Sequence, residues 1–218
     1  MSKHYQIAID GPAGAGKSTI AKELASLLNY TFINSGGIFR SIAVAVVLNN
    51  LDINDSKSIV SLLPKIKVTQ IGNDMYLNGN NISDKTWTQE ITVIVPKIAQ
   101  IKEVREYTRD VQRKIAENSN IVIEGRDTTT VVFPNATLKC WVFADPIIRA
   151  TRRWEQTGKK ETLELYLKTM LERDKQDSER KIDPMKRATD AYDVDTSTMS
   201  IEHATKHILD EFYRRIKR

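Results

Sequence analysis

Short apolar runs alternate with longer amphipathic stretches along most of the chain. Five runs are rich in β-branched and aromatic residues and are bounded by turn residues, so we expect them to form strands. The predicted strands are residues 5–9, 30–33, 121–123, 138–144 and 191–194. Strands separated by helices are typical of a parallel sheet covered on both faces. The pattern therefore predicts an α/β protein, a three-layer α/β/α sandwich with a five-stranded parallel sheet.

Apolar residues that recur every three or four positions predict the helices between these strands. The clearest stretches are residues 20–28, 98–115 and 201–216, and a charged helical stretch is expected at residues 162–180. We expect Pro96 to start or kink the second of these, because proline lacks the N–H that a helix interior needs. Asp145-Pro146, directly after the fourth strand, supplies an N-cap and a first-turn proline for another helix.

Residues 66–82 have a different pattern, in which β-prone runs are short and closely spaced. They are divided by Gly72-Asn73-Asp74 and by Asn78-Gly79-Asn80, and both tripeptides are turn signals. This segment predicts a small antiparallel insertion within the parallel fold.

The chain of 218 residues fits one domain with an insertion or two small domains. Its longest uninterrupted apolar run, residues 42–48, is far below the roughly 18 residues of a membrane-spanning helix. The one cysteine, Cys140, cannot form an intrachain disulfide, and the N-terminus lacks a secretory pattern, so we expect a cytoplasmic protein. The net charge of +5 favours anionic partners without distinguishing nucleotides from nucleic acid.

Residues 11–18 match the phosphate-binding pattern G-x-x-x-x-G-K-[ST], between a predicted strand and a predicted helix. The glycines allow backbone N–H groups to surround a phosphate. Lys17 adds a full positive charge, and the Ser18 hydroxyl is placed to hold Mg²⁺. Glu124, at the end of the third strand, either holds a metal-bound water or supports the loop. The residues expected to bind the nucleoside triphosphate are Gly11, Pro12, Ala13, Gly14, Ala15, Gly16, Lys17, Ser18 and Thr19.

The acceptor is left open by this motif, because GTPases, motor ATPases and small-molecule kinases all use it. The chain is short, begins its P-loop early and lacks an Asn-Lys-x-Asp guanine signature, which favours a compact kinase. Arg40 and Arg126 follow the second and third strands, at the sheet edge where ligands usually lie. A planar guanidinium there suits a monophosphate, although a solvated surface charge is the alternative.

Arg173, Asp177 and Arg180 lie at helical positions i, i+4 and i+7 and therefore share one face. They form either a surface ion-pair ladder or a site in which Asp177 fixes the two guanidiniums or reaches a sugar hydroxyl. Three more arginines cluster on one turn before Gly158, where a mobile arginine lid would exclude water during transfer. These are Arg149, Arg152 and Arg153.

Four motifs taken together resemble those of bacterial cytidylate kinases, a family of nucleoside monophosphate kinases, along almost the entire chain. Residues 9–19 look like the family's P-loop, and residues 124–134 look like its GRD and VVFP segment. Residues 173–180 are similar to the helix after its lid, and residues 195–202 to its C-terminal signature. The resemblance implies in-line transfer of the ATP γ-phosphate to CMP or dCMP, giving ADP and CDP or dCDP.

The same resemblance implies a division of the chain and a Mg²⁺ cofactor. The expected parts are a core at 1–40, a monophosphate-binding insertion with antiparallel hairpins at 41–95, core at 96–153, a lid at 154–165 and core at 166–218. The partners would be ATP and CMP or dCMP, with no nucleic acid and no membrane. No sustained heptad demands a second copy, so we expect a monomer.

Carried over position by position, the family's site falls on named residues of this chain. The implied CMP-binding residues are Ser35, Gly36, Arg40, Arg105, Gly125, Arg126, Asp127, Arg173, Asp177 and Arg180. The implied catalytic residues are Lys17, Arg126, Arg152, Arg173 and Arg180. Arg105 and Asp127 would read cytosine, because a carboxylate accepts from its amino group and would repel the carbonyl of uracil. No general base is assigned, since the attacking phosphate oxygen is already anionic.

Two departures from the family pattern are visible. Pro96 stands where the family commonly offers a serine hydroxyl to the base, and Thr128-Thr129 replaces the more usual Ile/Met-Gly. Other acceptors, such as UMP or another deoxynucleotide, remain alternatives, whereas the arginine motifs argue against shikimate. A nucleotide-dependent switch or a nucleic-acid-binding protein that uses the positive charge is a further alternative.

Overall fold

The computed structural model describes residues 4–217. Backbone contacts divide them into two compact units. The first unit contains the residues up to Tyr30 and those from Asn120 onward, and the second contains Thr31–Ser119. The insertion expected at 41–95 lies wholly within the second unit.

The main sheet has five strands, as predicted. Its order is β2 (Thr31–Asn34), β6 (Ile121–Glu124), β1 (Gln6–Asp10), β7 (Leu138–Phe143) and β8 (Tyr192–Asp195). β1 pairs in parallel with β6 and β7, and β7 pairs in parallel with β8. Each strand lies within one residue of its predicted bounds, so the predicted α/β class and the parallel sheet are confirmed.

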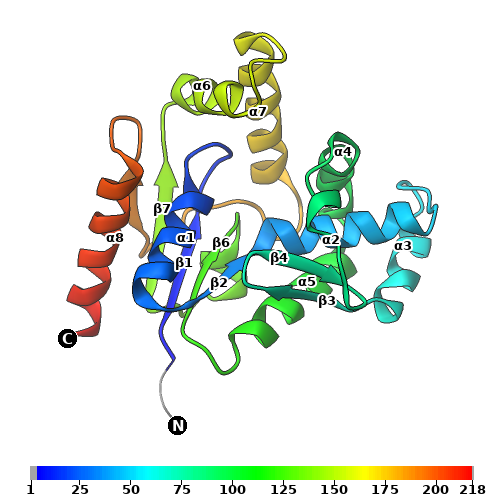
Figure 1. Ribbon diagram of the computed structural model, residues 1–218, viewed down its shortest axis with the longest axis horizontal. Coiled ribbons are helices and arrows are strands. Elements are labelled where there is room, and N and C mark those ends of the chain that lie inside the picture. The colour runs from blue at the N-terminus through cyan, green and yellow to red at the C-terminus, as the bar shows by residue number, and fades with distance from the viewer. Residues whose placement is uncertain (1–3, 218) are drawn as a thin grey trace. The chain divides into compact units, whose positions relative to one another are not determined.

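The central strands are apolar on both faces because both faces of a parallel sheet are covered. All of β6 is buried, as are the last four residues of β1. Helix α1 (Lys17–Leu28) packs on β6 and against α8 (Ile201–Ile216), which also contacts β7 and β8 (Figure 1). On α8, Ala204, Ile208 and Phe212 are fully buried, which confirms the apolar face predicted for the last helix.

Two further helices of the first unit extend beyond the carboxyl end of β7 and pack against each other (Figure 1). They are α6 (Pro146–Gln156) and α7 (Leu163–Glu179). The Asp145 carboxylate accepts a 2.8 Å hydrogen bond from the N–H of Ile147, and Pro146 occupies the first helical position. The predicted N-cap is therefore confirmed, as is the helix predicted over 162–180.

The second unit combines helices with a three-stranded antiparallel sheet. The strands β3 (Val68–Ile71), β4 (Asp74–Leu77) and β5 (Asn80–Asn81) confirm the predicted antiparallel segment. Gly72 and Gly79 have φ angles of 58° and 84°, a left-handed conformation that glycine adopts at low cost in tight turns. The helices are α2 (Ser35–Leu48), α3 (Ser56–Leu62), α4 (Gln89–Ile98) and α5 (Lys102–Ala116), with short 3₁₀ turns at Leu63–Lys65 and Ser83–Lys85.

The predicted start of the helix at Pro96 is wrong. Pro96 lies inside α4, near its end, and α5 begins only at Lys102. The N–H groups of Ala99 and Ile101 bond the carbonyls of Val95 and Ile98, closing the turn between the two helices. Ile98 is fully buried, so the apolar spacing continues across the break although the helix does not.

Candidate functional site

The segment that matches the phosphate-binding pattern connects β1 to α1 in the first unit. Gly11 has a φ of 146°, and a Cβ atom there would lie 1.9 Å from the carbonyl oxygen of Val142 on β7. Only glycine fits at this close approach. Gly16, with a φ of 87°, is the N-cap of α1 and brings no side-chain cap to the first N–H groups of the helix. The start of α1 therefore keeps the arrangement that binds a phosphate.

Lys17 is almost fully buried at the start of α1, and its ammonium donates a 2.6 Å hydrogen bond to the carbonyl oxygen of Pro12. Burial, followed by the nearby charge of Arg126, lowers the pKa of Lys17 from 10.5 to about 7. An anionic ligand in this loop would raise that pKa, because it favours the charged ammonium.

Ser18 and Glu124 are the oxygen donors beside Lys17. The Ser18 hydroxyl donates a 2.9 Å hydrogen bond to the Glu124 carboxylate at the end of β6. Mg²⁺ prefers oxygen ligands and retains several waters. A hydroxyl beside a carboxylate next to a phosphate-binding loop therefore fits that ion. Both expected functions of Glu124 remain open.

The tip of the P-loop is held by two charged side chains from α6 and α7. Asp174 accepts a 2.9 Å hydrogen bond from the N–H of Ala13, and Arg149 donates one of 2.8 Å to the Ala13 carbonyl. The two side chains pair with each other at 2.5 Å, and Arg149 is buried. We call this pair the Arg149–Asp174 clamp. It holds the two consecutive peptide groups on either side of the Ala13 Cα and directs the N–H of Ala13 to Asp174.

The C-terminal signature supports the P-loop at a second point. The Thr196 hydroxyl donates a 3.0 Å hydrogen bond to the carbonyl oxygen of Ala15. Arg152 in turn donates a 2.6 Å hydrogen bond to the Thr196 carbonyl. The structure therefore places Arg152, a predicted catalytic residue, beside the segment that follows β8.

A network of ion pairs connects the loop after β6 to the end of α7. The Asp177 carboxylate accepts a 3.1 Å hydrogen bond from Arg126 and one of 3.4 Å from Arg180. Arg180 also pairs with Asp127 at 3.1 Å. These side chains are mostly buried, so the surface-ladder interpretation is wrong.

The other interpretation, that Asp177 fixes two guanidiniums, is confirmed, but one of the two arginines differs from the prediction. The second arginine that it bonds is Arg126 instead of Arg173. Arg173 is partly buried beside this network, and burial, then the charge of Arg126, lowers its pKa. Arg126, Arg173 and Arg180 are thus gathered at one place in the first unit.

Gly125 lies in the first unit beside this network, where its carbonyl accepts a 3.1 Å hydrogen bond from Arg126. The other four predicted acceptor residues belong to the second unit. Ser35 begins α2 and accepts a 3.2 Å hydrogen bond from Gln112, and Gly36 follows it in the first turn. Arg40 is buried and donates a 2.9 Å hydrogen bond to the Thr86 carbonyl. Its guanidinium carbon lies 4.3 Å from the ring centre of Trp87. Arg105 on α5 is also buried and donates a 3.1 Å hydrogen bond to the Ala99 carbonyl.

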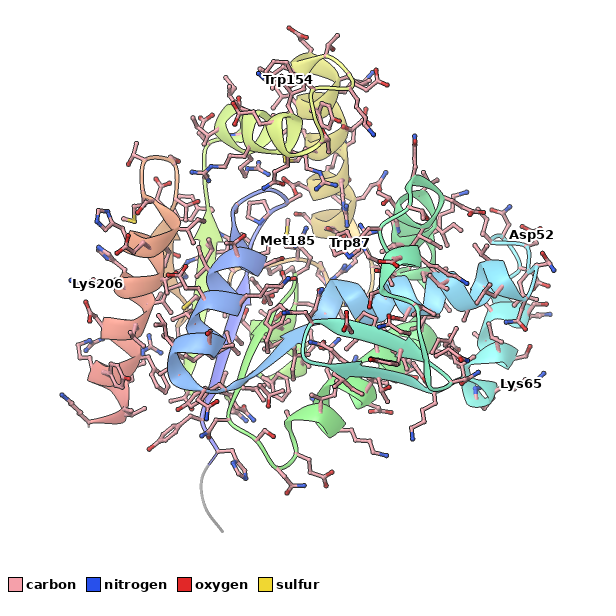
Figure 2. All side chains as sticks on the ribbon, in the orientation of Figure 1. Asp52, Lys65, Trp87, Trp154, Met185 and Lys206 are labelled. Atoms are coloured by element: carbon pink, nitrogen blue, oxygen red, sulfur yellow. The ribbon has the colours of Figure 1, made fainter. Side chains whose placement is uncertain are left out.

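The predicted lid is the short connection between α6 and α7. Gly158 has a φ of 74° in its turn. Trp154, at the tip in Figure 2, donates a 2.7 Å hydrogen bond to the Glu161 carbonyl, and the ammonium of Lys159 lies 4.7 Å from the Trp154 ring centre. These contacts order the turn.

Three supporting roles were not apparent from the sequence. Arg149 and Asp174 were noted only within arginine-rich motifs, and nothing local indicates that they pair across 25 positions. Asp10, buried at the end of β1, accepts hydrogen bonds from Thr128 and Thr129. The only available signals were the position of Asp10 before the P-loop and the unusual threonine pair.

The cytidylate kinase family model matches residues 7–214. The cytidylate kinase of Fervidobacterium nodosum is 41% identical over 211 residues, covering 95% of both chains. That of Alkaliphilus oremlandii is 41% identical over 209 residues, covering 94% of this chain and 96% of its own. That of Bacillus subtilis is 36% identical over 217 residues, covering 96% of this chain and 97% of its own.

Two solved structures are similar at the level of the fold. An uncharacterized protein from Eubacterium ventriosum has a TM-score of 0.58 at 15% identity, covering 96% of this chain and 99% of its own. Shikimate kinase from Acinetobacter baumannii has a TM-score of 0.50 at 15% identity, covering 97% of this chain and 94% of its own. Within residues 4–217, no helix has both the length and the apolar character needed to span a membrane. The full-length family match and the similar relatives confirm the predicted resemblance: the chain belongs to the cytidylate kinase family.

Proposed function

We propose that this protein transfers the γ-phosphate of ATP to CMP and dCMP, giving ADP with CDP or dCDP. The observation that carries the proposal is the pairing of a formed P-loop with an arginine network in one unit. Lys17 belongs to the P-loop, and Arg126 and Arg180 belong to the arginine network. A loop for a triphosphate together with arginines for a second phosphate suits a kinase whose acceptor is itself a phosphate.

The P-loop binds and orients the donor. Backbone N–H groups at the start of α1 surround the β-phosphate, and Lys17 stabilises charge on the β- and γ-phosphates. Ser18, with Glu124 beside it, would hold Mg²⁺, the cofactor that we propose for the reaction. The bound ion would supply positive charge that offsets the negative charge of the phosphates during transfer.

Charged side chains of the first unit orient the phosphate of the acceptor. Arg126, Arg173 and Arg180 bind phosphate oxygens. An oxygen of the CMP phosphate then attacks the γ-phosphorus of ATP, and the bond between the γ-phosphorus and the oxygen that leaves with ADP breaks. Arg152 adds positive charge on the donor side. Asp127 reads cytosine, Gly125 binds CMP, and Asp177, which bonds Arg126 and Arg180, lies near the sugar. The family pattern also assigns Arg105 to reading cytosine, and Ser35, Gly36 and Arg40 to binding CMP.

The proposed organisation is the one that the family implies. Residues 41–95 form the monophosphate-binding insertion, and residues 154–165 form the lid, with Arg152 on α6 just before it. We propose that the protein works as a monomer in the cytoplasm, and the buried thiol of Cys140 supports a reducing compartment. Membership of the cytidylate kinase family disfavours a switch or a nucleic-acid-binding role.

An acceptor panel tests this proposal. The purified protein is incubated with ATP, Mg²⁺ and one of CMP, dCMP, UMP, dTMP or shikimate, and ADP release is measured. We expect CMP and dCMP to be phosphorylated with the highest kcat/KM. A higher kcat/KM for UMP or shikimate would contradict the proposed substrate, and tight, salt-sensitive nucleic-acid binding with slow turnover would contradict the kinase assignment.

A further inference from the structure

Asp10 is the centre of a buried hydrogen-bond cluster that the proposed mechanism does not use. One of its carboxylate oxygens accepts from the N–H and the hydroxyl of Thr128, at 3.0 and 2.8 Å. The other accepts from the N–H and the hydroxyl of Thr129, at 2.7 and 2.6 Å. We call these three residues the Asp10–threonine cluster. All four donors come from two consecutive residues.

The cluster is closed to solvent. Asp10 and Thr128 are fully buried, and Thr129 is 1% exposed. A buried carboxylate that accepts four hydrogen bonds holds its partners firmly, because a donor that turns away leaves a buried acceptor unsatisfied. The hydroxyls supply two of the four bonds, so the residues at positions 128 and 129 matter beyond their backbone.

Asp10 joins the two loops of the first unit that carry the proposed chemistry. It directly precedes Gly11, the first residue of the P-loop. Its partners directly follow Asp127, the residue proposed to read cytosine. They also begin a five-residue π-helical turn, Thr128–Val132, a rare element that often occurs at functional sites.

The turn fixes the backbone of Asp127 from its C-terminal side. The Asp127 carbonyl accepts a 2.9 Å hydrogen bond from the N–H of Val131, while the cluster anchors Thr128 and Thr129, two of the three residues between them. The Asp127 carboxylate pairs with Arg180 at 3.1 Å. A rotation of the peptide after Asp127 would move this carboxylate, and the cluster opposes that rotation.

We propose that Thr128 and Thr129, held by Asp10, are positioning residues for the selection of cytosine over uracil. The inference rests on the proposed function, in which Asp127 reads the base. Neither threonine touches the nucleotide. They fix the direction of the Asp127 carboxylate, so that it meets the cytosine amino group at hydrogen-bond distance and the uracil carbonyl at a repulsive one.

Valine substitutions test the inference because they remove the hydroxyls and keep the shape and the backbone donors. The variants Thr128→Val, Thr129→Val and the double variant are compared with Thr128→Ser and Thr129→Ser, which keep a hydroxyl. The ratio of kcat/KM for CMP to that for UMP is measured, with KM for ATP and the melting temperature. We expect the ratio to fall roughly three- to tenfold in the double valine variant and to be retained by the serine variants.

Thr205→Val is the matched control. Thr205 is 1% exposed on α8, and its hydroxyl has no hydrogen-bond partner among the described residues. This variant makes the same chemical change at a buried site far along the chain, and it is expected to keep the wild-type CMP/UMP ratio.

An unchanged ratio in the double valine variant overturns the inference, even if the melting temperature falls, because a purely structural role lowers stability without changing base selection. If the double variant is too unstable to purify, the two single valine variants carry the same test. Wild-type protein that does not phosphorylate CMP overturns the proposed function. A ratio that collapses in Asp127→Ala and persists in the valine variants overturns this inference alone.

Discussion

The two loops that follow β1 and β6 lie on neighbouring strands of one sheet, yet they are held in opposite ways. The P-loop after β1 is held at its tip, where the Arg149–Asp174 clamp bonds both the N–H and the carbonyl of Ala13. The loop after β6 is held at its base, by the hydrogen bonds of Asp10 to the residues after Asp127. The first support comes from distant helices and the second from the adjacent strand.

This difference follows from what each loop presents to a ligand. The P-loop binds through backbone N–H groups, so the conformation of its peptides must be fixed along their length. The loop after β6 works through the side chains of Arg126 and Asp127, so it needs a rigid base and charged partners for the side chains. Changes to the first support should therefore impair the use of ATP, and changes to the second should impair the choice of acceptor.

The largest effect is expected for Lys17→Ala, which removes the one full charge that the P-loop itself supplies. We expect kcat to fall about 100- to 1,000-fold, because charge on the transferring phosphate loses its stabilisation, while the melting temperature changes little. Steady-state kinetics and thermal unfolding check both parts. Lys206→Ala, at an exposed lysine of α8, is the control. Turnover near the wild-type level would show that the P-loop is not the donor site.

Asp127→Ala tests the acceptor loop. We expect kcat/KM for CMP to fall roughly 10- to 100-fold and kcat/KM for UMP to fall much less, because the lost hydrogen bond is specific to the cytosine amino group. The variant also leaves Arg180 without one of its carboxylate partners, so the melting temperature is measured alongside. Equal losses for CMP and UMP would remove Asp127 from base selection.

Asp174→Asn sharpens the comparison from the donor side. It keeps a side chain of the same size at the N–H of Ala13 and removes the charge that pairs with Arg149. We expect KM for ATP to rise about 10-fold, since a loosened P-loop tip must be ordered again on binding, and KM for CMP to change less than twofold. Glu172→Gln, at an exposed acid two positions earlier on α7, is the control. A parallel rise of both KM values would show that the clamp does not act on the ATP site specifically.

The sequence predicted those features that depend on neighbouring residues. The five strands appear within one residue of their expected bounds because each is a short β-branched run between turn signals. The P-loop follows from eight consecutive residues in the right context, and Asp145-Pro146 fixes the start of α6 by its own chemistry. In each case the interactions that decide the structure span only a few positions.

Features that depend on pairing across the chain were not predictable. Asp177 shares its face of α7 with Arg173, but its observed partner Arg126 lies 51 positions away. The clamp connects Ala13 to side chains 136 and 161 positions later. The break after α4 was missed for a related reason, because Ile98 is buried by tertiary packing and therefore extends the helical spacing past the last turn.

The smallest predicted effect concerns pH. Lys17 has a pKa of about 7 in the free protein, chiefly because it is buried, and the phosphates of bound ATP should raise it. ATP binding then takes up a proton above about pH 7, so the affinity for ATP falls as pH rises, roughly fivefold between pH 7 and pH 8. Titration calorimetry in two buffers of different ionisation enthalpy measures this uptake. Lys17→Arg, whose side chain does not titrate in this range, should not show it. Binding without proton uptake in the wild-type protein would mean that the ammonium of Lys17 is already charged before ATP arrives, and that the P-loop is preorganised in charge as well as in shape.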